Sequence, residues 1–339
     1  MQLLPVLPCR RASCKACPRV PALIDTPAGL GHGRLGRAFE NRQARAWHGE
    51  GMTDELALIG CEWNGSHIRA WAFDAEGEIL SAFHAREECG PAPGMWAKRL
   101  GFHLTEWLGA APEVPVIGCG AMAAHAPLLS APLQLAHLAG HITEHGGLHL
   151  VPWIAQAAPA DLTCGAETLL FGLGDDAAGA ICLAGQHTRH CTVELGRLTR
   201  FCTEITAELR DLLLSHGSLA LDAATPQAFD MAVFRDWLER ALDAGRAAPV
   251  FSVEAAIRQG QLTVQNKAAA LAGLMIGADV AAHYDPGDEV LLVADGPLLE
   301  AYGLALETLG ADVEEASAIE ALQDGLFELA DLAGLLGGD

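Results

Sequence analysis

The stretch from Leu56 to Asp74, LALIGCEWNGSHIRAWAFD, holds the residues whose spacing most clearly suggests chemistry. It predicts a buried strand that ends near the carboxylate of Glu62, a tight polar turn, and a second strand. A carboxylate followed by a Gly/Ser turn with free N–H groups suits a site for phosphate and a metal ion. An ordinary hairpin with Glu62 on its exposed edge explains the same residues, and this stretch alone favours that simpler interpretation.

Two other groups of side chains have the spacing of metal ligands. Histidines recur at steps of four between residues 127 and 150, and a pair at i and i+4 of a helix can bind a metal ion. Gly146-Gly147 interrupts such a helix and only Glu144 could complete the ligand set, so we favour a solvated polar loop. Cysteines near the N-terminus could form a metal clip, but no second pair at zinc-finger spacing follows. The residues concerned are His137, His141, His145 and His149, and Cys9, Cys14 and Cys17.

The composition limits the function classes. The 339 residues suffice for two domains, and 51% of them are hydrophobic, which allows a substantial core. No run of about 18 apolar residues is present, so no membrane-spanning helix is expected. The net charge of −22 argues against nucleic acids and anionic membrane surfaces as partners, but not against a small anionic ligand. The ten cysteines lack regular spacing, which fits reduced thiols in a cytoplasmic protein better than a disulfide framework.

Residues 1–51 differ from the rest of the chain. They contain eight Lys or Arg against three Asp or Glu, a charge of +5 that leaves −27 for the remainder. Their Pro, Gly and Arg content and their lack of periodicity predict a disordered or irregular extension. This extension could be a targeting segment without a clear cleavage signature, or it could precede a natural start at Met52, where the globular pattern begins.

From Leu56 onward, hydrophobic periodicity predicts the same order of elements twice. Three short strands precede a helix in each cycle, and such repetition indicates two related α/β lobes. Gly172 and Gly174 follow a helix and not a strand, so they do not fit a dinucleotide-binding loop. The predicted elements are strands at 56–63, 67–74, 78–84, 114–119, 180–185, 189–194, 198–204, 289–294 and around 312–313, and helices at 95–108, 165–174, 204–216, 226–245, 250–259, 262–284, 298–309 and 317–335.

Six segments after Met52 carry a resemblance to a known family. They are EWNGSHIRAW at 62–71, DLTCGAETLLFG at 161–172, GQHTR at 185–189, TEITAELRDLLLSH at 203–216, AGLMIGADVA at 272–281 and LLVADGPLLEAY at 291–302. In this order they resemble the 2-dehydro-3-deoxygalactonokinases, members of the sugar-kinase/actin/Hsp70-like superfamily. The resemblance covers nearly all of the chain after Met52, and the set is specific although no single segment is.

The resemblance implies an α/β fold of two ribonuclease-H-like lobes with mixed sheets and a cleft between them, the actin-like ATPase and sugar kinase fold. We place the lobes at residues 52–164 and 165–339. The resemblance also implies a cytoplasmic kinase that uses ATP and Mg²⁺ to phosphorylate a 2-keto-3-deoxy sugar acid, of the 2-dehydro-3-deoxy-D-galactonate type, in galactonate or galactose catabolism. A homodimer is compatible with the sequence, which determines neither the oligomeric state nor the stereochemistry of the sugar.

The same resemblance implies roles for eleven residues. Phosphoryl transfer needs positioned phosphates, a Mg²⁺ ion held by carboxylate and water, and a group that accepts the proton of the attacking hydroxyl. Either Glu167 or Glu208 could also serve as that general base. The implied residues are Glu62, His187 and Glu208 for catalysis, Glu62 for Mg²⁺, Gly65, Ser66, Gly185, Arg189 and Gly296 for the nucleotide, and Arg69, Asp161 and Glu167 for the substrate.

Three of these residues also allow purely structural interpretations. Arg69 could pair with Glu62 across the hairpin, His187 could stabilise its turn, and Glu208 could balance the N-terminus of its helix. A catalytically impaired paralogue that binds a sugar acid or a nucleotide is therefore the alternative to an active kinase. The departures from the family pattern that motivate this alternative fall mostly on polar positions, including Asn64, Cys164, Asp295 and Pro297.

Overall fold

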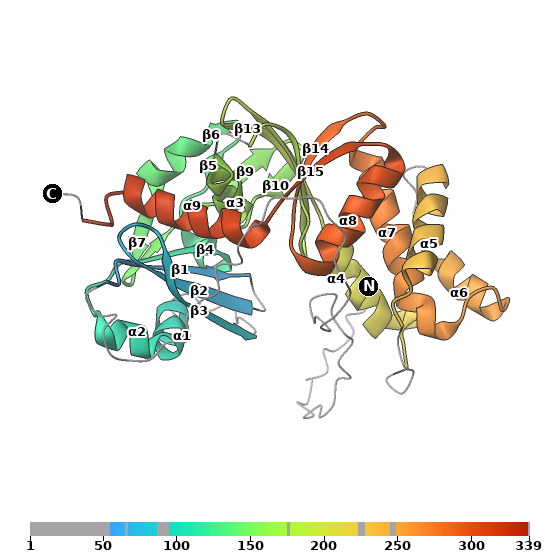
Figure 1. The fold of residues 1–339 in the computed structure, drawn as a ribbon, viewed down its shortest axis with the longest axis horizontal. Helices are drawn as coiled ribbons and strands as arrows, with labels where there is room; N and C mark the ends of the chain where they lie inside the picture. Colours follow the sequence, from blue (N-terminus) through green and yellow to red (C-terminus); the bar gives the residue numbers. More distant parts are fainter. Residues whose placement is uncertain are drawn as a thin grey trace, which may run out of the picture.

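The computed structural model describes residues 55–64, 67–86, 95–174, 177–222, 228–244 and 249–337 (Figure 1). The prediction for residues 1–51, and the nucleotide roles of Gly65 and Ser66, lie outside these ranges. Within the described ranges, no helix has both the length and the apolar character needed to cross a bilayer.

The first sheet has six strands in the order β3-β2-β1-β4-β8-β7. The strands β1, β2 and β3 form the antiparallel meander that the sequence predicts, and β4 pairs in parallel with β1. No continuous helix carries the four histidines of residues 127–150, which lie on a 3₁₀ helix and on two separate strands. The bounds are β1 (Leu58–Trp63), β2 (His67–Phe73), β3 (Ile79–Arg86), β4 (Val116–Gly120), η1 (Ala121–His125), η2 (Leu135–His141), β7 (Thr143–His145) and β8 (Leu148–Leu150).

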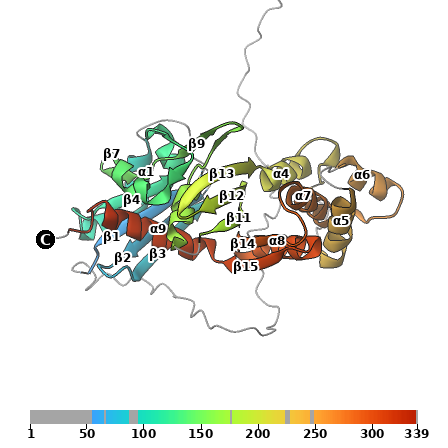
Figure 2. The same ribbon diagram turned by 90° about the horizontal axis from the view of Figure 1, so that it is seen from above.

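Helices cover both faces of this sheet because its strands alternate two sets of apolar residues. Ile59, Cys61 and Trp63 point to α1 and α2, while Leu58 points to α3 and α9. In place of the single helix predicted at 95–108, the structure has two short helices, α1 and α2. The C-terminal helix α9 returns across the first sheet (Figures 1 and 2). The bounds are α1 (Met95–His103), α2 (Thr105–Ala110), α3 (Ala166–Gly172) and α9 (Ala318–Leu332).

Two glycines allow α3 and α9 to cross with their backbones in contact. A Cβ atom at Gly172 would lie 1.8 Å from the carbonyl oxygen of Ala321, and one at Gly325 would lie 2.1 Å from that of Thr168. Any larger residue would force the helices apart. Two helices from the second predicted lobe therefore complete the layer on the first sheet, while the division at residue 164 stays a prediction.

The second sheet repeats the arrangement of the first, in the order β15-β14-β11-β12-β13-β6. Again three antiparallel strands are joined by a parallel neighbour, here β14 beside β11. A small third sheet, β10-β9-β5, lies between them in the chain. The bounds are β5 (Leu129–Ser130), β6 (Leu133–Gln134), β9 (Ile154–Ala157), β10 (Ala160–Leu162), β11 (Gly179–Leu183), β12 (Thr188–Glu194), β13 (Arg197–Glu204), β14 (Glu289–Val293) and β15 (Asp312–Ala316).

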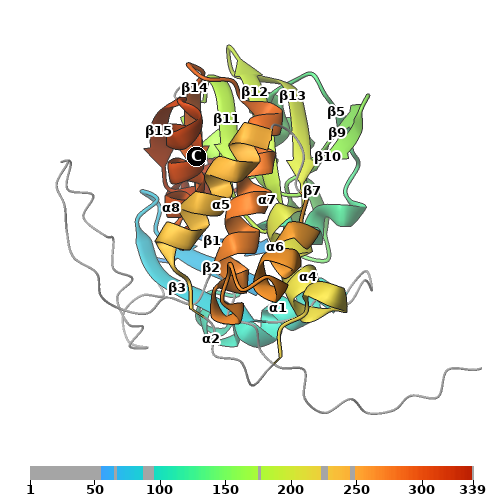
Figure 3. The same cartoon turned by 90° about the vertical axis from the view of Figure 1, so that its right-hand side faces the viewer.

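The buried helix α7 organises the helical side of the second sheet, with α5 against it (Figure 3). A Cβ atom at Gly273 would lie 2.2 Å from the carbonyl oxygen of Phe234, so the small residues of α7 let α5 approach closely. The bounds are α4 (Thr206–Ser215), η4 (Gly217–Leu219), α5 (Met231–Ala244), α6 (Phe251–Arg258), η5 (Val264–Asn266), α7 (Lys267–His283) and α8 (Gly296–Leu309). The α/β fold with two mixed sheets is confirmed.

Candidate active site

The end of β1 carries an ion pair between Glu62 and Arg69. These residues are opposite each other in the β1–β2 ladder. Arg69 donates to Glu62 Oε2 from Nε at 2.8 Å and approaches it with Nη2 at 2.6 Å. The Glu62 side chain is 14% exposed, so the pair is shielded but still open to solvent. Arg69 therefore pairs with Glu62 across the hairpin, as its structural interpretation predicts. The ion pair fixes the direction of the Glu62 carboxylate.

Close backbone packing connects Glu62 to the start of α3. Gly120 ends β4 beside Glu62, and a Cβ atom there would lie 2.6 Å from the carbonyl oxygen of Trp63. A Cβ atom at Gly165 would in turn lie 3.0 Å from Gly120 Cα. Both glycines have positive φ, and Cys164 before the second has φ of 50°. This tight turn brings the first residues of α3 to the end of β1 and β4.

Glu167 lies in the first turn of α3 and is fully buried. Its Oε2 accepts a hydrogen bond from the backbone N–H of Gly165 at 3.0 Å. Its Oε1 has no hydrogen-bond partner among the described residues. Burial raises the pKa of Glu167 from 4.5 to about 7, against the opposing effects of Thr163, Gly165 and Arg189. A carboxyl group with this pKa and an open oxygen can hold or accept a proton near neutral pH.

Arg189 reaches the same region from the second sheet. It is the second residue of β12, and its charge acts on both Cys164 and Glu167. Its Nη1 donates to the carbonyl oxygen of His187 at 3.3 Å. Its buried Nε has no hydrogen-bond partner among the described residues. Glu167 on α3 and Arg189 on β12 are thus close enough for the Arg189 charge to lower the pKa of Glu167, and each has a buried polar atom without a hydrogen-bond partner in the described part of the chain.

His187 and Glu208, both predicted to be catalytic, contact each other directly. His187 lies in the turn before β12 and Glu208 in the first turn of α4. His187 Nε2 lies 2.6 Å from Glu208 Oε2, and the two side chains are 39% and 40% exposed. The carboxylate can orient the imidazole through this contact. The sequence identified both residues but not their pairing.

Asp161 makes structural contacts with both of its carboxylate oxygens. Oδ1 accepts from the backbone N–H of Leu162 and Oδ2 from that of Thr203, each at 2.7 Å. The bond from Thr203 joins β10 to β13, so Asp161 links the small third sheet to the second sheet. Its predicted contact with substrate is not tested by this geometry and stays a prediction.

The predicted nucleotide loop at the start of α8 includes Gly296, whose φ is 58°. Asp295 before it accepts a hydrogen bond from Ser317 Oγ at 2.8 Å and one from the N–H of Ile319 at 3.0 Å. The negative charge of Asp295 therefore serves the N-terminus of α9. Gly185, at the end of β11, is half-buried, and its nearest contact for a Cβ atom is 3.4 Å away.

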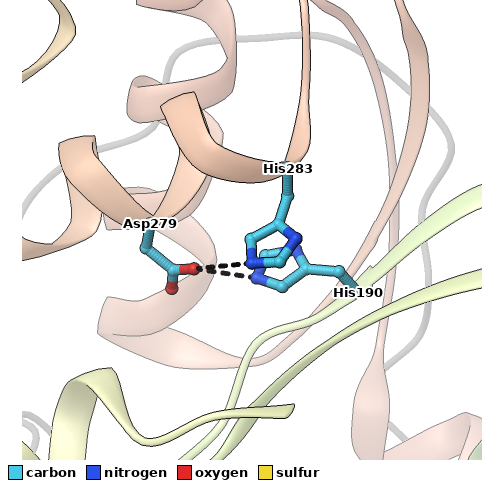
Figure 4. Close-up of side chains that lie close together, drawn as sticks. All are labelled: His190, Asp279 and His283. Carbon is cyan, nitrogen blue, oxygen red and sulfur yellow. Dashed lines mark hydrogen bonds and ion pairs between the residues drawn. The ribbon is translucent and has the colours of Figure 1, made fainter. Parts of the chain in front are cut away.

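Sequence reasoning missed a buried polar network on the other face of β12. His190 Nε2 donates to Asp279 Oδ1 at 2.8 Å (Figure 4). Its Nδ1 lies 2.9 Å from the Tyr284 hydroxyl. Asp279 Oδ2 accepts from Tyr302 at 2.6 Å and from Thr206 at 3.0 Å. The signal available in the sequence was a single Asp inside the otherwise apolar run 268–282 of the helix predicted at 262–284.

Comparisons with known proteins agree with this architecture. The family model for 2-keto-3-deoxy-galactonokinase matches residues 62–329. A probable 2-dehydro-3-deoxygalactonokinase of Rhizobium meliloti (strain 1021) is 29% identical over 308 residues, which cover 82% of this chain and 98% of the relative. The 2-dehydro-3-deoxygalactonokinase of Escherichia coli (strain K12) is 27% identical over 289 residues, 80% of this chain and 97% of the relative.

A solved structure supports the same conclusion. The crystal structure of a Sinorhizobium meliloti protein assigned to the 2-dehydro-3-deoxygalactonokinases aligns with a TM-score of 0.73 and 29% identity, over 80% of this chain and 95% of that one. The two mixed sheets, each with three antiparallel strands and a parallel neighbour, define the class: an α/β protein with the actin-like ATPase and sugar kinase fold. Within that class, the chain belongs to the 2-keto-3-deoxy-galactonokinase family.

Proposed function

We propose that this protein transfers the γ-phosphoryl group of ATP to a hydroxyl group of a 2-keto-3-deoxy sugar acid, of the 2-dehydro-3-deoxygalactonate type. The observation that carries the proposal is that Glu167 and Arg189, which interact electrostatically, each keep a buried polar atom without a hydrogen-bond partner among the residues that the structure describes. A hydroxyl group of a sugar acid can donate a hydrogen bond to Glu167 Oε1, and a phosphate oxygen can accept one from Arg189 Nε. The names of the relatives support the choice of acceptor. They give no support to the alternative of an inactive paralogue.

Glu167 is assigned to the sugar acid. Its Oε1 accepts a hydrogen bond from a substrate hydroxyl, which satisfies the unpaired oxygen. Because its Oε2 is fixed by the N–H of Gly165, the carboxylate cannot rotate freely and the hydroxyl is positioned. Arg69 lies beside Glu62 and is the cation that we assign to the carboxylate of the sugar acid.

Arg189 is assigned to the phosphate groups of ATP. A guanidinium group donates two hydrogen bonds in a fixed geometry that matches phosphate oxygens. The unpaired Nε of Arg189 is one such donor. The backbone at Gly185 and Gly296, with that of Gly65 and Ser66, is assigned to the same nucleotide, since glycine lets a phosphate approach the chain closely.

His187 and Glu208 are assigned to the proton. The substrate oxygen forms a bond to the γ-phosphorus while the bond to the β–γ bridging oxygen of ATP breaks and ADP leaves. His187 Nε2 is held by Glu208, so the proton from the substrate hydroxyl passes to Nδ1 of the imidazole. Glu208 stabilises the imidazolium that results.

The residues at the end of β1 fit a Mg²⁺ ion. Mg²⁺ is usually held by one or two carboxylates together with waters and substrate phosphates. Glu62 supplies a partly exposed carboxylate whose direction is fixed by Arg69, and it would hold the ion through water. The ion, when bound, neutralises charge on the phosphate oxygens.

A reduced, cytoplasmic location is part of the proposal. Four of the six free cysteines among the described residues are buried, and burial raises the pKa values of their thiols. Such thiols are packing residues and not disulfide partners. A homodimer stays a prediction.

The test is a coupled ADP-release assay with Mg²⁺, ATP and a panel of 2-keto-3-deoxy sugar acids. We expect the highest kcat/KM with the galactonate-derived acid and none with the corresponding aldoses, which lack the carboxylate. Binding of Mg²⁺ and ATP should also raise the melting temperature of the full chain, which a thermal-shift assay measures. If the protein binds nucleotide but forms no ADP with any acid of the panel, the proposal is contradicted.

A further inference from the structure

One face of the β12–β13 hairpin carries an unusual set of polar side chains that the proposed reaction does not use. His190 is opposite Cys202 in the ladder, and Thr188 is opposite Glu204, so these side chains share a face. That face lies against the end of α7, where Asp279 and His283 are four residues apart and project to the same side. Figure 4 shows the rings of His190 and His283 stacked beside Asp279.

Donor atoms of metal-ligand type converge on His283. Its Nε2 lies 3.3 Å from Glu204 Oε1 and 4.0 Å from Asp279 Oδ1. Cys202 Sγ lies 3.9 Å from the same Glu204 oxygen. The donor atoms of Cys202, Glu204 and His283 all lie within 4.8 Å of one another. We propose that Cys202, Glu204 and His283 bind a divalent cation of the Zn²⁺ class, with water in the fourth position.

The spacing of the donors fits this ion. Zn²⁺ bonds of about 2.0–2.3 Å at tetrahedral angles separate neighbouring ligand atoms by roughly 3.3–3.6 Å. His283 Nε2 and Cys202 Sγ lie 3.3 and 3.9 Å from Glu204 Oε1, within a few tenths of an ångström of these values. The separation between Cys202 and His283 is below 4.8 Å, so these two side chains need to approach each other by at most about 1.3 Å. A sulfur and an imidazole nitrogen favour Zn²⁺ or Co²⁺ over Mg²⁺, which prefers oxygen ligands.

The surroundings hold the ligands in place. The ring of His190 stacks on that of His283 with 3.8 Å between centroids and 9° between planes. Asp279 is fixed by His190, Thr206 and Tyr302. Such outer hydrogen bonds are the usual support of metal ligands. Glu204 is 44% exposed and His283 is 17% exposed, which leaves a path for the ion to enter.

This site is separate from the proposed phosphoryl-transfer site. Successive residues of β12 point to opposite faces of the sheet, so Arg189 faces Cys164 and Glu167 while His190 faces α7. A cation at the hairpin would tie the end of β13 to the end of α7. It would therefore stabilise the second lobe without contacting the groups that we assign to ATP.

The experiment uses Co²⁺ as a spectroscopic substitute for Zn²⁺. The full-length protein is stripped with a chelator, reduced with a phosphine, and titrated with cobalt chloride. We expect one equivalent of Co²⁺ to bind with the sulfur-to-metal charge-transfer absorption of a thiolate ligand, and Zn²⁺ to displace it. Cys202→Ser should remove that absorption, and Glu204→Gln should weaken binding at least tenfold.

Two control variants separate this site from other cysteines. Cys164→Ser removes a half-buried thiol outside the cluster and should leave the absorption intact. The double variant Cys14→Ser, Cys17→Ser removes the N-terminal pair and should also leave it intact. An absorption that is lost in the double variant but persists in Cys202→Ser would overturn the proposal, as would the absence of stoichiometric Co²⁺ binding.

Thermal unfolding gives a second measurement of metal binding and shows whether each variant is folded. Zn²⁺ should raise the melting temperature of the native chain, because it binds only the folded state. Glu204→Gln changes a partly exposed side chain by one atom, so it should fold normally and lose most of this shift. An unchanged shift in folded Glu204→Gln contradicts the assignment.

Discussion

The two faces of β12 carry polar clusters of different character. On one face, Arg189 and Glu167 each keep a buried polar atom without a partner among the described residues. On the other face, His190 is bonded through both ring nitrogens and Asp279 through both oxygens. Buried polar groups that lack a partner are costly, whereas a satisfied network rigidifies the structure. We therefore assign the reactants to the first face, and a structural role in the second lobe to the other.

The largest expected effect is on catalysis at the unsatisfied face. Glu167→Gln keeps the shape of the side chain but removes the ionisable carboxylate that positions the substrate hydroxyl. We expect kcat to fall by more than about 10²-fold in the ADP-release assay, because the hydroxyl is no longer held in line with the γ-phosphorus. The control is Glu194→Gln, at an exposed position at the end of β12, which should keep wild-type turnover. Equal rates for both variants would remove Glu167 from the site.

The second prediction concerns stability and pH. Burial raises the pKa of Glu167 from 4.5 to about 7, so the folded protein holds a proton that the unfolded chain has lost in this range. The contribution to the free energy of unfolding is fully present below about pH 4.5 and falls by about 3 kcal/mol as the pH rises through 7.

A comparison of the wild type with Glu167→Gln isolates the contribution of Glu167 to the free energy of unfolding. Urea unfolding of the wild type and of Glu167→Gln at a series of pH values gives the difference in their free energies of unfolding. We expect Glu167→Gln to gain stability relative to the wild type as the pH rises from 4.5 to 8. A difference that does not change with pH shows that Glu167 titrates normally.

The third prediction concerns ATP. Arg189→Met keeps most of the apolar stem and removes the guanidinium that we assign to phosphate. We expect kcat/KM for ATP to fall roughly 10²-fold, with a smaller change in the KM for the sugar acid. Arg200→Met, at an exposed position of β13, is the matched control. A normal kcat/KM for ATP in Arg189→Met would place the phosphates elsewhere.

The smallest effect is expected on the satisfied face. Burial alone would raise the pKa of Asp279, but hydrogen bonds from His190, Tyr302 and Thr206 hold it below its usual value, so the carboxylate is ionised at neutral pH. Asp279→Asn weakens these bonds and should lower the free energy of unfolding by about 2 kcal/mol. Turnover of the folded fraction should change less than in Glu167→Gln. Calorimetry and ADP release, measured on the same sample, separate the two effects.

Much of the fold could be predicted because it depends on local patterns. The alternation of apolar residues in 56–74 and again in 180–204 specifies strands with two distinct faces. The return of α9 to the first sheet could not be predicted, since it depends on contact between Gly172 and Gly325, which are far apart in sequence. Periodicity describes a single element and not its distant partner.

The site could be predicted in part for the same reason. Glu62 and Arg69 lie in one hairpin, so their pairing was an explicit alternative. His187 and Glu208 were both identified, but their contact depends on where α4 begins relative to the β11–β12 turn. The raised pKa of Glu167 was not predicted, because it arises from burial against the glycine turn at Gly165. Burial of this kind is a property of the packed structure.

The central claim is that this chain phosphorylates a 2-keto-3-deoxy sugar acid. The most direct measurement is mass spectrometry of the products after incubation of the purified full chain with Mg²⁺, ATP and 2-dehydro-3-deoxygalactonate. The account predicts one phosphorylated sugar acid for each ADP formed, and no such product when the acid is omitted. ADP formation without a phosphorylated acid, or unchanged ATP and acid, would contradict it.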